Sequence, residues 1–192
     1  MTTPPTLSNA LSFGLQGRVV IVTGAANGIG EACARRFAAE AAHVVLADVN
    51  SERGAAVAAE LRSAGHSAGF MACDVSRKAD VDALVDHVLQ AFGRLDVLVN
   101  NAGIFKAADF LDVTEEDFDA VINVNIKGSF LMGQAAARAS AISGWSSTTV
   151  WIDRCRASRG HTSMLAVTLP MRTMLALSAG SALPSGAVPA KG

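Results

Sequence analysis

This chain of 192 residues lacks several residue types and patterns, and each absence narrows what it can do. It contains no tyrosine, so no phenol is available to donate or accept a proton. Its three cysteines, Cys33, Cys73 and Cys155, are widely spaced and match neither a metal-binding pattern nor a disulfide framework. Such cysteine usage is typical of a reducing cytosol. A net charge of -1 provides no basic field for nucleic acid or for an anionic membrane.

Targeting signals are also missing. Residues 1–16 contain no Lys or Arg, which argues against a secretory signal or a transit peptide, and we expect a flexible leader there. Pro170 and Arg172 interrupt the best apolar run, so no segment predicts a membrane span. We therefore expect a cytoplasmic protein. With 51% hydrophobic and 17% charged residues, the chain has enough apolar side chains for a sizeable core, in one good-sized domain or at most two small ones.

A glycine-rich turn between a strand and a helix is the most informative stretch. Residues 19–22 are all β-branched, which suits a strand buried on both faces. Gly24, Gly28 and Gly30 then mark a turn, and the alanine-rich residues 31–42 predict a helix. The first N–H groups of a helix lack partners and carry partial positive charge, and glycine lets a phosphate approach them closely. An ordinary tight turn is the alternative, but the flanking strand and helix favour a nucleotide site.

Strands and helices alternate along the chain as far as residue 139. Further apolar strands are expected at residues 43–47, 67–73 and 95–99, and further helices at 51–63, 76–92 and 114–139. Ser51 is the expected cap of one helix, and Thr114 begins a capping box at another. This alternation predicts an α/β fold, a Rossmann-type doubly wound parallel sheet. Ligands of such sheets bind beyond the carboxyl ends of the strands.

Two acidic residues follow expected strands. Asp48 lies 18 residues after Gly30, where a carboxylate can accept hydrogen bonds from both hydroxyls of an adenosine ribose. Its charge would repel a 2′-phosphate, and Asn27 is not basic, so NAD is favoured over NADP. The alternative for Asp48 is a turn or cap residue. Asp74 follows the next strand and is placed to meet the adenine amino group, although an ordinary loop acid explains it equally well.

Four motifs together resemble the short-chain dehydrogenases/reductases. They occupy residues 23–30, 73–75, 100–103 and 124–128, in the family's order and spacing, and the resemblance covers residues 17–139. It implies hydride transfer between NAD(P) and a small alcohol or carbonyl substrate. The residues that the resemblance places at the cofactor are Gly24, Asn27, Gly28, Ile29, Gly30, Asp48, Asp74, Val75, Asn101, Ala102 and Gly103.

The resemblance is incomplete at the catalytic groups. Asn125 matches the family's catalytic asparagine, which positions a proton-relay water, although a solvated helical Asn is the alternative. The family also uses a tyrosine with a lysine four residues later, whose charge lowers the phenol pKa. That pair is absent here. The alternative function is therefore a truncated, non-catalytic dinucleotide-binding module.

The composition changes sharply near residue 139, and acidic residues become rare beyond it. We expect residues 17–139 to form the NAD-binding domain, with its C-terminal part truncated or aberrant, and residues 140–192 to form a divergent tail. The β-branched and aromatic residues 148–152 predict one strand in that tail. Our hypothesis is that the tail is an out-of-frame or aberrantly spliced continuation, which resequencing the coding DNA tests. The alternative is a tail with an unrelated role of its own. The helix at 114–139 would then lack its usual cover, so we expect self-association or pairing with intact relatives.

Overall fold

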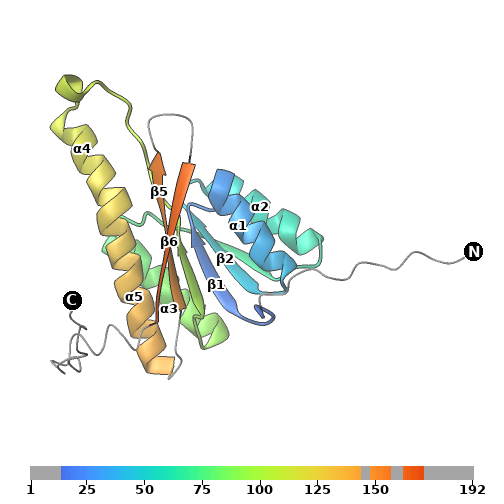
Figure 1. Ribbon diagram of the computed structural model, residues 1–192. Helices are drawn as coiled ribbons and strands as arrows, with labels where there is room; N and C mark the ends of the chain where they lie inside the picture. The colour runs from blue at the N-terminus through green and yellow to red at the C-terminus, as the bar shows by residue number, and fades with distance from the viewer. Residues whose placement is uncertain (1–13, 144–147, 157–161, 171–192) are drawn as a thin grey trace, which may run out of the picture.

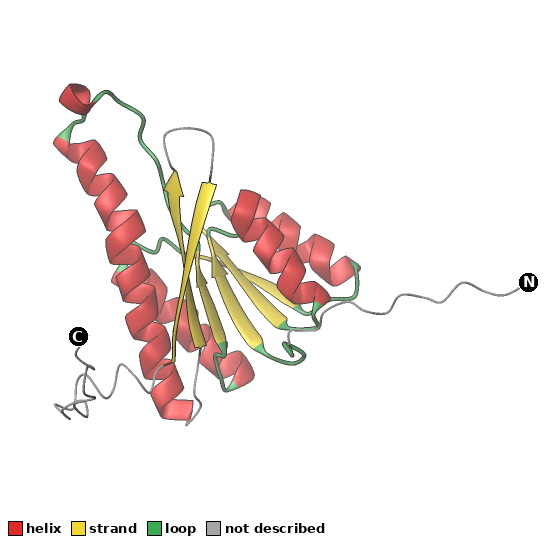
Figure 2. Cartoon of the chain, viewed as in Figure 1, coloured by secondary structure: helices red, strands yellow, loops and turns green. Residues whose placement is uncertain are grey.

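The computed structural model describes residues 14–143, 148–156 and 162–170, and most of the expected leader lies outside them. A central sheet is flanked by helices on both faces (Figures 1 and 2). The strand order is β3-β2-β1-β4-β5-β6. The strands are β1 Val19–Thr23, β2 His43–Asp48, β3 Ala68–Ala72, β4 Val97–Asn100, β5 Thr148–Arg156 and β6 Thr162–Pro170.

The helices lie in sequence between the strands, as the alternating pattern predicts. They are α1 Gly28–Ala39, α2 Ser51–Ser63, α3 Lys78–Phe92, α4 Glu115–Val121 and α5 Ser129–Ser143. A 3₁₀ turn, η1 (Phe110–Asp112), precedes α4, and a π-helical segment, η2 (Ile122–Gly128), joins α4 to α5. Among the described residues, no helix combines the length and the apolar character that a membrane span requires.

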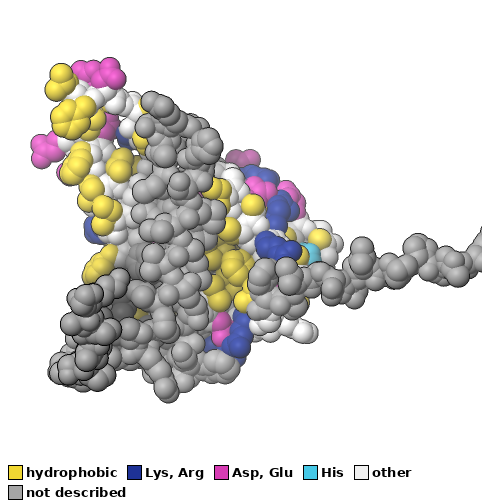
Figure 3. Space-filling model, viewed as in Figure 1, with side chains coloured by type: hydrophobic (Ala, Val, Ile, Leu, Met, Phe, Trp, Pro, Cys, Tyr) yellow, Lys and Arg dark blue, Asp and Glu magenta, His cyan; other side chains and the backbone are white. Residues whose placement is uncertain are grey.

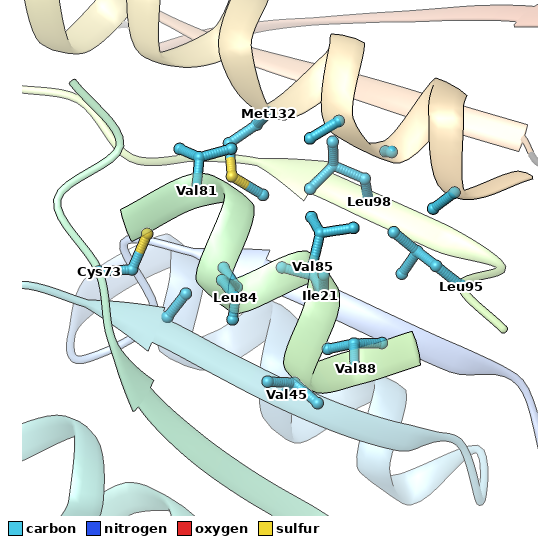
Figure 4. Close-up of a cluster of buried hydrophobic side chains, with 14 of the residues drawn as sticks. Ile21, Val45, Cys73, Val81, Leu84, Val85, Val88, Leu95, Leu98 and Met132 are labelled. Atoms are coloured by element: carbon cyan, nitrogen blue, oxygen red, sulfur yellow. The ribbon is translucent and has the colours of Figure 1, made fainter. Parts of the chain in front are cut away.

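The doubly wound arrangement is confirmed, because β1 to β5 run parallel and each sheet face has its own core. One core includes residues of α1 and α2, among them Ala34, Ala38 and Val57. The other packs α3 and α5 against the opposite face, where Leu84 and Met132 are fully buried (Figure 4). Because both faces of the sheet are buried, the strands consist of continuous runs of apolar residues.

Several expected element ends need correction. Helix α1 begins at Gly28 rather than at residue 31, so Gly28 and Gly30 belong to its first turn. The helix ends at Ala39 because the chain turns there, with Ala41 at φ 60°. The cap of α2 is Asn50 rather than Ser51, since the Asn50 side chain accepts a hydrogen bond from the Arg53 N–H at 3.0 Å.

The expected helix at 114–139 is present but interrupted. Thr114 caps it as predicted, because its hydroxyl oxygen accepts a hydrogen bond from the Asp117 N–H at 3.1 Å. The segment η2 then divides it into α4 and α5. A π-helical turn inserts extra residues into the α-helical spacing, and such turns are frequent at functional sites. Sequence periodicity alone did not predict this interruption.

The sheet continues past residue 139. Strand β5 covers the residues 148–152 for which a strand is expected and pairs in parallel with β4. Strand β6 was not predicted, and it corrects the expectation of an entirely parallel sheet because it runs antiparallel to β5. Only residues 157–161 join the two strands, and a connection this short permits a hairpin but not a parallel crossover.

Candidate functional site

A cleft lies at the carboxyl ends of the central strands. Its volume is about 200 Å³. Strand β1 pairs with β2 on one side and β4 on the other, so the strand order reverses there. Crevices at such switch points are the usual ligand sites of open α/β sheets. The cleft is lined by Gly24, Asn27, Asp48, Val49, Cys73, Asp74, Val75, Asn101, Ala102, Gly103, Ile104 and Val124.

The turn after β1 needs glycine at two positions. Gly24 has φ 63°, a left-handed conformation that side chains disfavour, and a Cβ there would lie 2.8 Å from the Ala102 Cα. Gly30 lies in the first turn of α1, where a Cβ would lie 2.1 Å from the Gly24 carbonyl oxygen. The missing side chains let the start of α1 pack directly against the end of β1. An open backbone cradle at a helix N-terminus results, which suits an anionic group.

Thr23 and Asn101 lock the ends of β1 and β4 together. The buried Thr23 hydroxyl donates to the Val99 carbonyl at 3.2 Å and accepts the Asn101 and Ala102 N–H groups, both at 3.0 Å. The Asn101 side-chain amide donates to the carbonyls of Thr23 and Gly24, at 3.0 and 3.1 Å. These bonds fix the glycine turn relative to the loop after β4, so the cleft is preformed. Thr23 was missed as a site residue, although it begins the glycine motif.

Asp48 projects from the end of β2 at the edge of the cleft and is half-buried. Its Oδ2 accepts the Ala26 N–H at 2.9 Å, and its Oδ1 accepts the Asn50 N–H at 2.9 Å. Each carboxylate oxygen can accept more than one hydrogen bond. Asp48 is therefore held in place by the backbone and retains acceptor capacity, so the turn-residue and ligand-binding interpretations are compatible.

Asp74 and Val75 also line the cleft, after β3. Asp74 Oδ1 accepts both the N–H and the hydroxyl of Ser76, at 2.9 and 2.7 Å. This arrangement is an Asx turn that leads toward α3. One oxygen of Asp74 thus has a structural role, and the side chain still faces the cleft.

Asn125 lies in the π-helical segment, and both ends of its side-chain amide are paired. Its Oδ1 accepts the Ile104 N–H at 2.9 Å, and its Nδ2 donates to the Ile104 carbonyl at 3.0 Å. Asn125 does not line the cleft itself but anchors Ile104, which does. The Asn125 amide is therefore paired with the backbone rather than with solvent alone.

The cleft contains one thiol, which is unreactive. Burial, together with the charges of Asp80 and Asp74, raises the pKa of Cys73 to about 12. A thiol is a nucleophile only as its thiolate, so Cys73 has no nucleophilic role near neutral pH. The described residues also contain no group of His, Cys, Asp and Glu able to hold a metal ion.

A dinucleotide fits the residues present. The glycine cradle and the start of α1 suit the pyrophosphate, and the acceptor Asp48 at the cleft edge suits a ribose diol. Eight of the cofactor residues predicted from the sequence line the cleft: Gly24, Asn27, Asp48, Asp74, Val75, Asn101, Ala102 and Gly103. Gly28, Ile29 and Gly30 form the first turn of α1 directly after Asn27. Four further lining residues, Val49, Cys73, Ile104 and Val124, were not predicted as site residues. Cys73 and Val124 belong to recognised motifs, whereas Val49 and Ile104 carry no signal beyond being apolar.

Comparison with known proteins agrees with this geometry. A D-threitol dehydrogenase of Mycolicibacterium smegmatis is 42% identical over 139 residues, which are 72% of this chain and 53% of that protein. A sorbitol dehydrogenase of Cereibacter sphaeroides is 39% identical over 130 residues, 68% of this chain and 50% of that protein. A (2S)-[(R)-hydroxy(phenyl)methyl]succinyl-CoA dehydrogenase subunit of Thauera aromatica is 43% identical over 123 residues, 64% of this chain and 50% of that protein.

The chain thus spans about half the length of the curated relatives it matches. The family model described as "short chain dehydrogenase" matches residues 18–146, which include the glycine turn, Asp48, Asn101 and Asn125. With the match over most of the chain and the doubly wound sheet behind the cleft, this protein belongs to the short chain dehydrogenase family.

Proposed function

We propose that this chain binds NAD in the cleft and belongs functionally to the oxidoreductases that exchange a hydride between nicotinamide and an alcohol or ketone. The observation that carries the proposal is the Asp48 carboxylate at the cleft edge, which a hydrogen bond from the Ala26 N–H holds beside the glycine turn. When bound, the nicotinamide supplies the hydride chemistry. The protein supplies the binding and orientation.

The proposal gives the chain's own residues the following roles, which their positions support. The start of α1, with Gly24, Gly28 and Gly30, would hold the pyrophosphate through backbone N–H groups. Asp74 and Val75 would border the adenine. Asn101, Ala102 and Gly103 line the cleft beside β4 and would border the ribose on the nicotinamide side. Asn125, as the family's catalytic asparagine, would hold a relay water near Ile104.

The preference for NAD over NADP rests on charge. Asp48 offers acceptors to the 2′- and 3′-hydroxyls, whereas a 2′-phosphate would meet its negative charge. Asn27, which lines the cleft as well, adds no compensating cation. Like charges in close contact cost several-fold in affinity even in a partly solvated site.

The substrate class is a small alcohol or carbonyl compound. Relatives named for threitol and sorbitol act on polyols, and they match this chain over its N-terminal two-thirds. We also place the protein in the cytoplasm, because Cys33 and Cys73 are free thiols.

A second candidate function is dinucleotide binding without turnover. The observation that favours it is the absence of tyrosine from the sequence, since the family's proton relay needs a phenol. Loss of a positioned acid or base costs about 10²–10⁴-fold in rate.

Two measurements on the full chain test these proposals. Titration with NADH, followed by nicotinamide fluorescence, should show saturable binding that Asp48→Ala weakens. Incubation with NAD and a panel of secondary alcohols and polyols then measures turnover. Binding with turnover supports the oxidoreductase, binding without turnover supports the second candidate, and a lack of NADH binding rejects both.

A further inference from the structure

An ion-pair cluster joins α1 to α2 next to the cleft. Glu31 Oε1 lies 2.9 Å from Nη2 of Arg53 and 2.7 Å from Nη2 of Arg35. Arg53 Nη1 lies 3.1 Å from Glu60 Oε1, and Arg35 also pairs with Glu60. Two acids and two bases thus alternate across the two helices. Figure 3 shows acidic and basic side chains side by side over this part of the molecule.

Glu31 is the central member of this cluster. Its side chain is only 17% exposed, whereas Arg35, Arg53 and Glu60 are 40% exposed or more. Desolvation raises the pKa of Glu31, but hydrogen bonds from Arg35 and Arg53 outweigh it, so this pKa lies below its ordinary value. Glu31 is therefore ionised at neutral pH and accepts hydrogen bonds from two guanidinium groups at once.

The cluster is connected to Asp48 from two directions. Asn50 donates its N–H to Asp48 Oδ1, and its own side chain accepts the N–H of Arg53. On the other side, Ala26 donates its N–H to Asp48 Oδ2. Ala26 belongs to the turn that leads into α1, on which Glu31 lies.

A closed ring of contacts results. Asp48 is held between one N–H group that precedes α1 and one at the cap of α2. The β1–β2 ladder brings the two segments together, and each donor lies just before one of the two helices. The Glu31–Arg53 pair connects the first turns of those two helices, close in sequence to the two donors.

We propose that Glu31 and Arg53 are positioning residues for the ribose site: their ion pair sets the separation of the two backbone donors that orient Asp48. The inference rests on the proposed binding of NAD. The pair would raise the affinity for NAD, and the preference for NAD over NADP, without contacting the dinucleotide. A purely structural pair would contribute to stability alone, and exposed pairs contribute little even there.

The test is a double-mutant cycle on the full chain, read out as the dissociation constant for NADH. Glu31→Ala and Arg53→Ala should each weaken NADH binding about three- to tenfold, the range expected for residues coupled through shared contacts. Both should weaken NADPH binding much less, so discrimination between the two dinucleotides falls. In the Asp48→Ala background, Glu31→Ala should have no further effect, because its action passes through Asp48.

A matched control is Asp82→Asn, which breaks the i,i+4 pair with Lys78 on α3, on the other face of the sheet. It should leave NADH affinity unchanged. Circular dichroism at the titration temperature confirms that each variant is folded.

The outcomes distinguish the proposed function from the positioning role of Glu31 and Arg53. Failure of the wild-type chain to bind NADH rejects the proposed function and this inference with it. Wild-type binding that Glu31→Ala leaves unchanged rejects the inference alone. An equal loss from Glu31→Ala with and without Asp48, or a loss from Asp82→Asn, also overturns it.

Discussion

Single residues in this protein carry distinct and separable structural roles. Asp96 illustrates a buried charge whose partners are all identified. It accepts the Val19 N–H at 2.8 Å and hydrogen bonds from Arg18 and Arg94. Burial raises the pKa of Asp96, but the hydrogen bonds from Arg94, Val19 and Arg18 more than offset this, and the net shift is downward. The ionised carboxylate therefore stabilises the start of β1.

Stability should depend on this carboxylate in acid. Because its folded-state pKa lies below the unfolded value of about 3.9, its contribution is complete above that value and is lost as the pH falls through the folded-state pKa. Asp96→Asn should remove about 3 kcal/mol of unfolding free energy at pH 7, the scale of a broken buried pair. Urea unfolding across pH 3–7 measures this. If Asp96→Asn lowered the free energy of unfolding equally at pH 3 and pH 7, this role of the carboxylate would be contradicted.

Gly30 should be intolerant of any side chain. Gly30→Ala places a Cβ against the Gly24 carbonyl oxygen. Because that oxygen belongs to the backbone, it cannot move aside without separating the end of β1 from the start of α1. We expect a loss of about 3 kcal/mol, at the upper end for overpacking. The urea midpoint measures it.

The control for that substitution is Gly69→Ala in β3. An added Cβ there meets nothing within 4 Å and the φ angle is not left-handed. Its stability should be unchanged or slightly increased. Equal losses at the two positions would show that the close approach at Gly30 is unimportant.

Most site residues could be predicted one by one, because each belongs to a short motif with a fixed relation to a strand end. Asp48 is predictable since parallel strands carry their ligands at the carboxyl end. Thr23 and the pairing of Asn125 with Ile104 were not predicted. Their partners are far apart in the sequence, and no local pattern shows which backbone groups a hydroxyl or an amide will meet.

At the scale of elements, the π-helical segment η2 and the loop after β4 form one unit. Asn125 makes two hydrogen bonds between them, to the carbonyl and from the N–H of Ile104. Asn125→Ala should therefore loosen the loop from residue 104 to η1 and destabilise the fold by about 1–2 kcal/mol, the worth of two partly exposed hydrogen bonds.

Hydrogen exchange is the appropriate measurement for this loop. The Ile104 amide should exchange faster in Asn125→Ala, because its acceptor is gone. Lys127→Ala, an exposed position in the same π-helical segment, should leave that exchange rate as it is in the wild type. Unchanged protection of Ile104 in Asn125→Ala would contradict the anchoring role.

Elements were predicted where their local pattern and their packing agree. Helix α3 has both a stripe of buried apolar residues and a glycine stop at Gly93, so its C-terminal end was predicted correctly. The predictions of the start of α1 and of the cap of α2 were wrong, because tertiary contacts order the glycine turn and Asn50. Strand β6 was not predicted, because its formation depends on pairing with the edge strand β5 more than on the local sequence of residues 162–170.

At the scale of the whole molecule, many of the exposed large apolar side chains among the described residues lie along one side. They gather over the loop after β4 and the α4–α5 helices, at the outer edge in Figure 3. The most exposed large ones there are Phe105, Phe110, Leu111, Phe118, Ile126 and Phe130. Phe110 and Leu111 are each more than 90% exposed. Monomeric soluble proteins rarely expose so contiguous an apolar surface.

Self-association should follow from this surface. We expect sedimentation velocity of the full chain to show species larger than a monomer, and Phe118→Ser with Phe130→Ser to reduce them. Val49→Ser is the control, because Val49 is even more exposed than Phe118 and Phe130 but lies at the cleft edge, after β2. A compact monomer at all concentrations would count against an exposed interaction surface.

The central claim is that the cleft accepts a dinucleotide with an unphosphorylated ribose. Paired equilibrium titrations of the full chain with NADH and with NADPH test it most directly. We predict saturable NADH binding below millimolar concentration. NADPH should bind at least about tenfold more weakly, because the Asp48 carboxylate repels the 2′-phosphate. Absence of NADH binding at millimolar concentration, or a preference for NADPH, would contradict it.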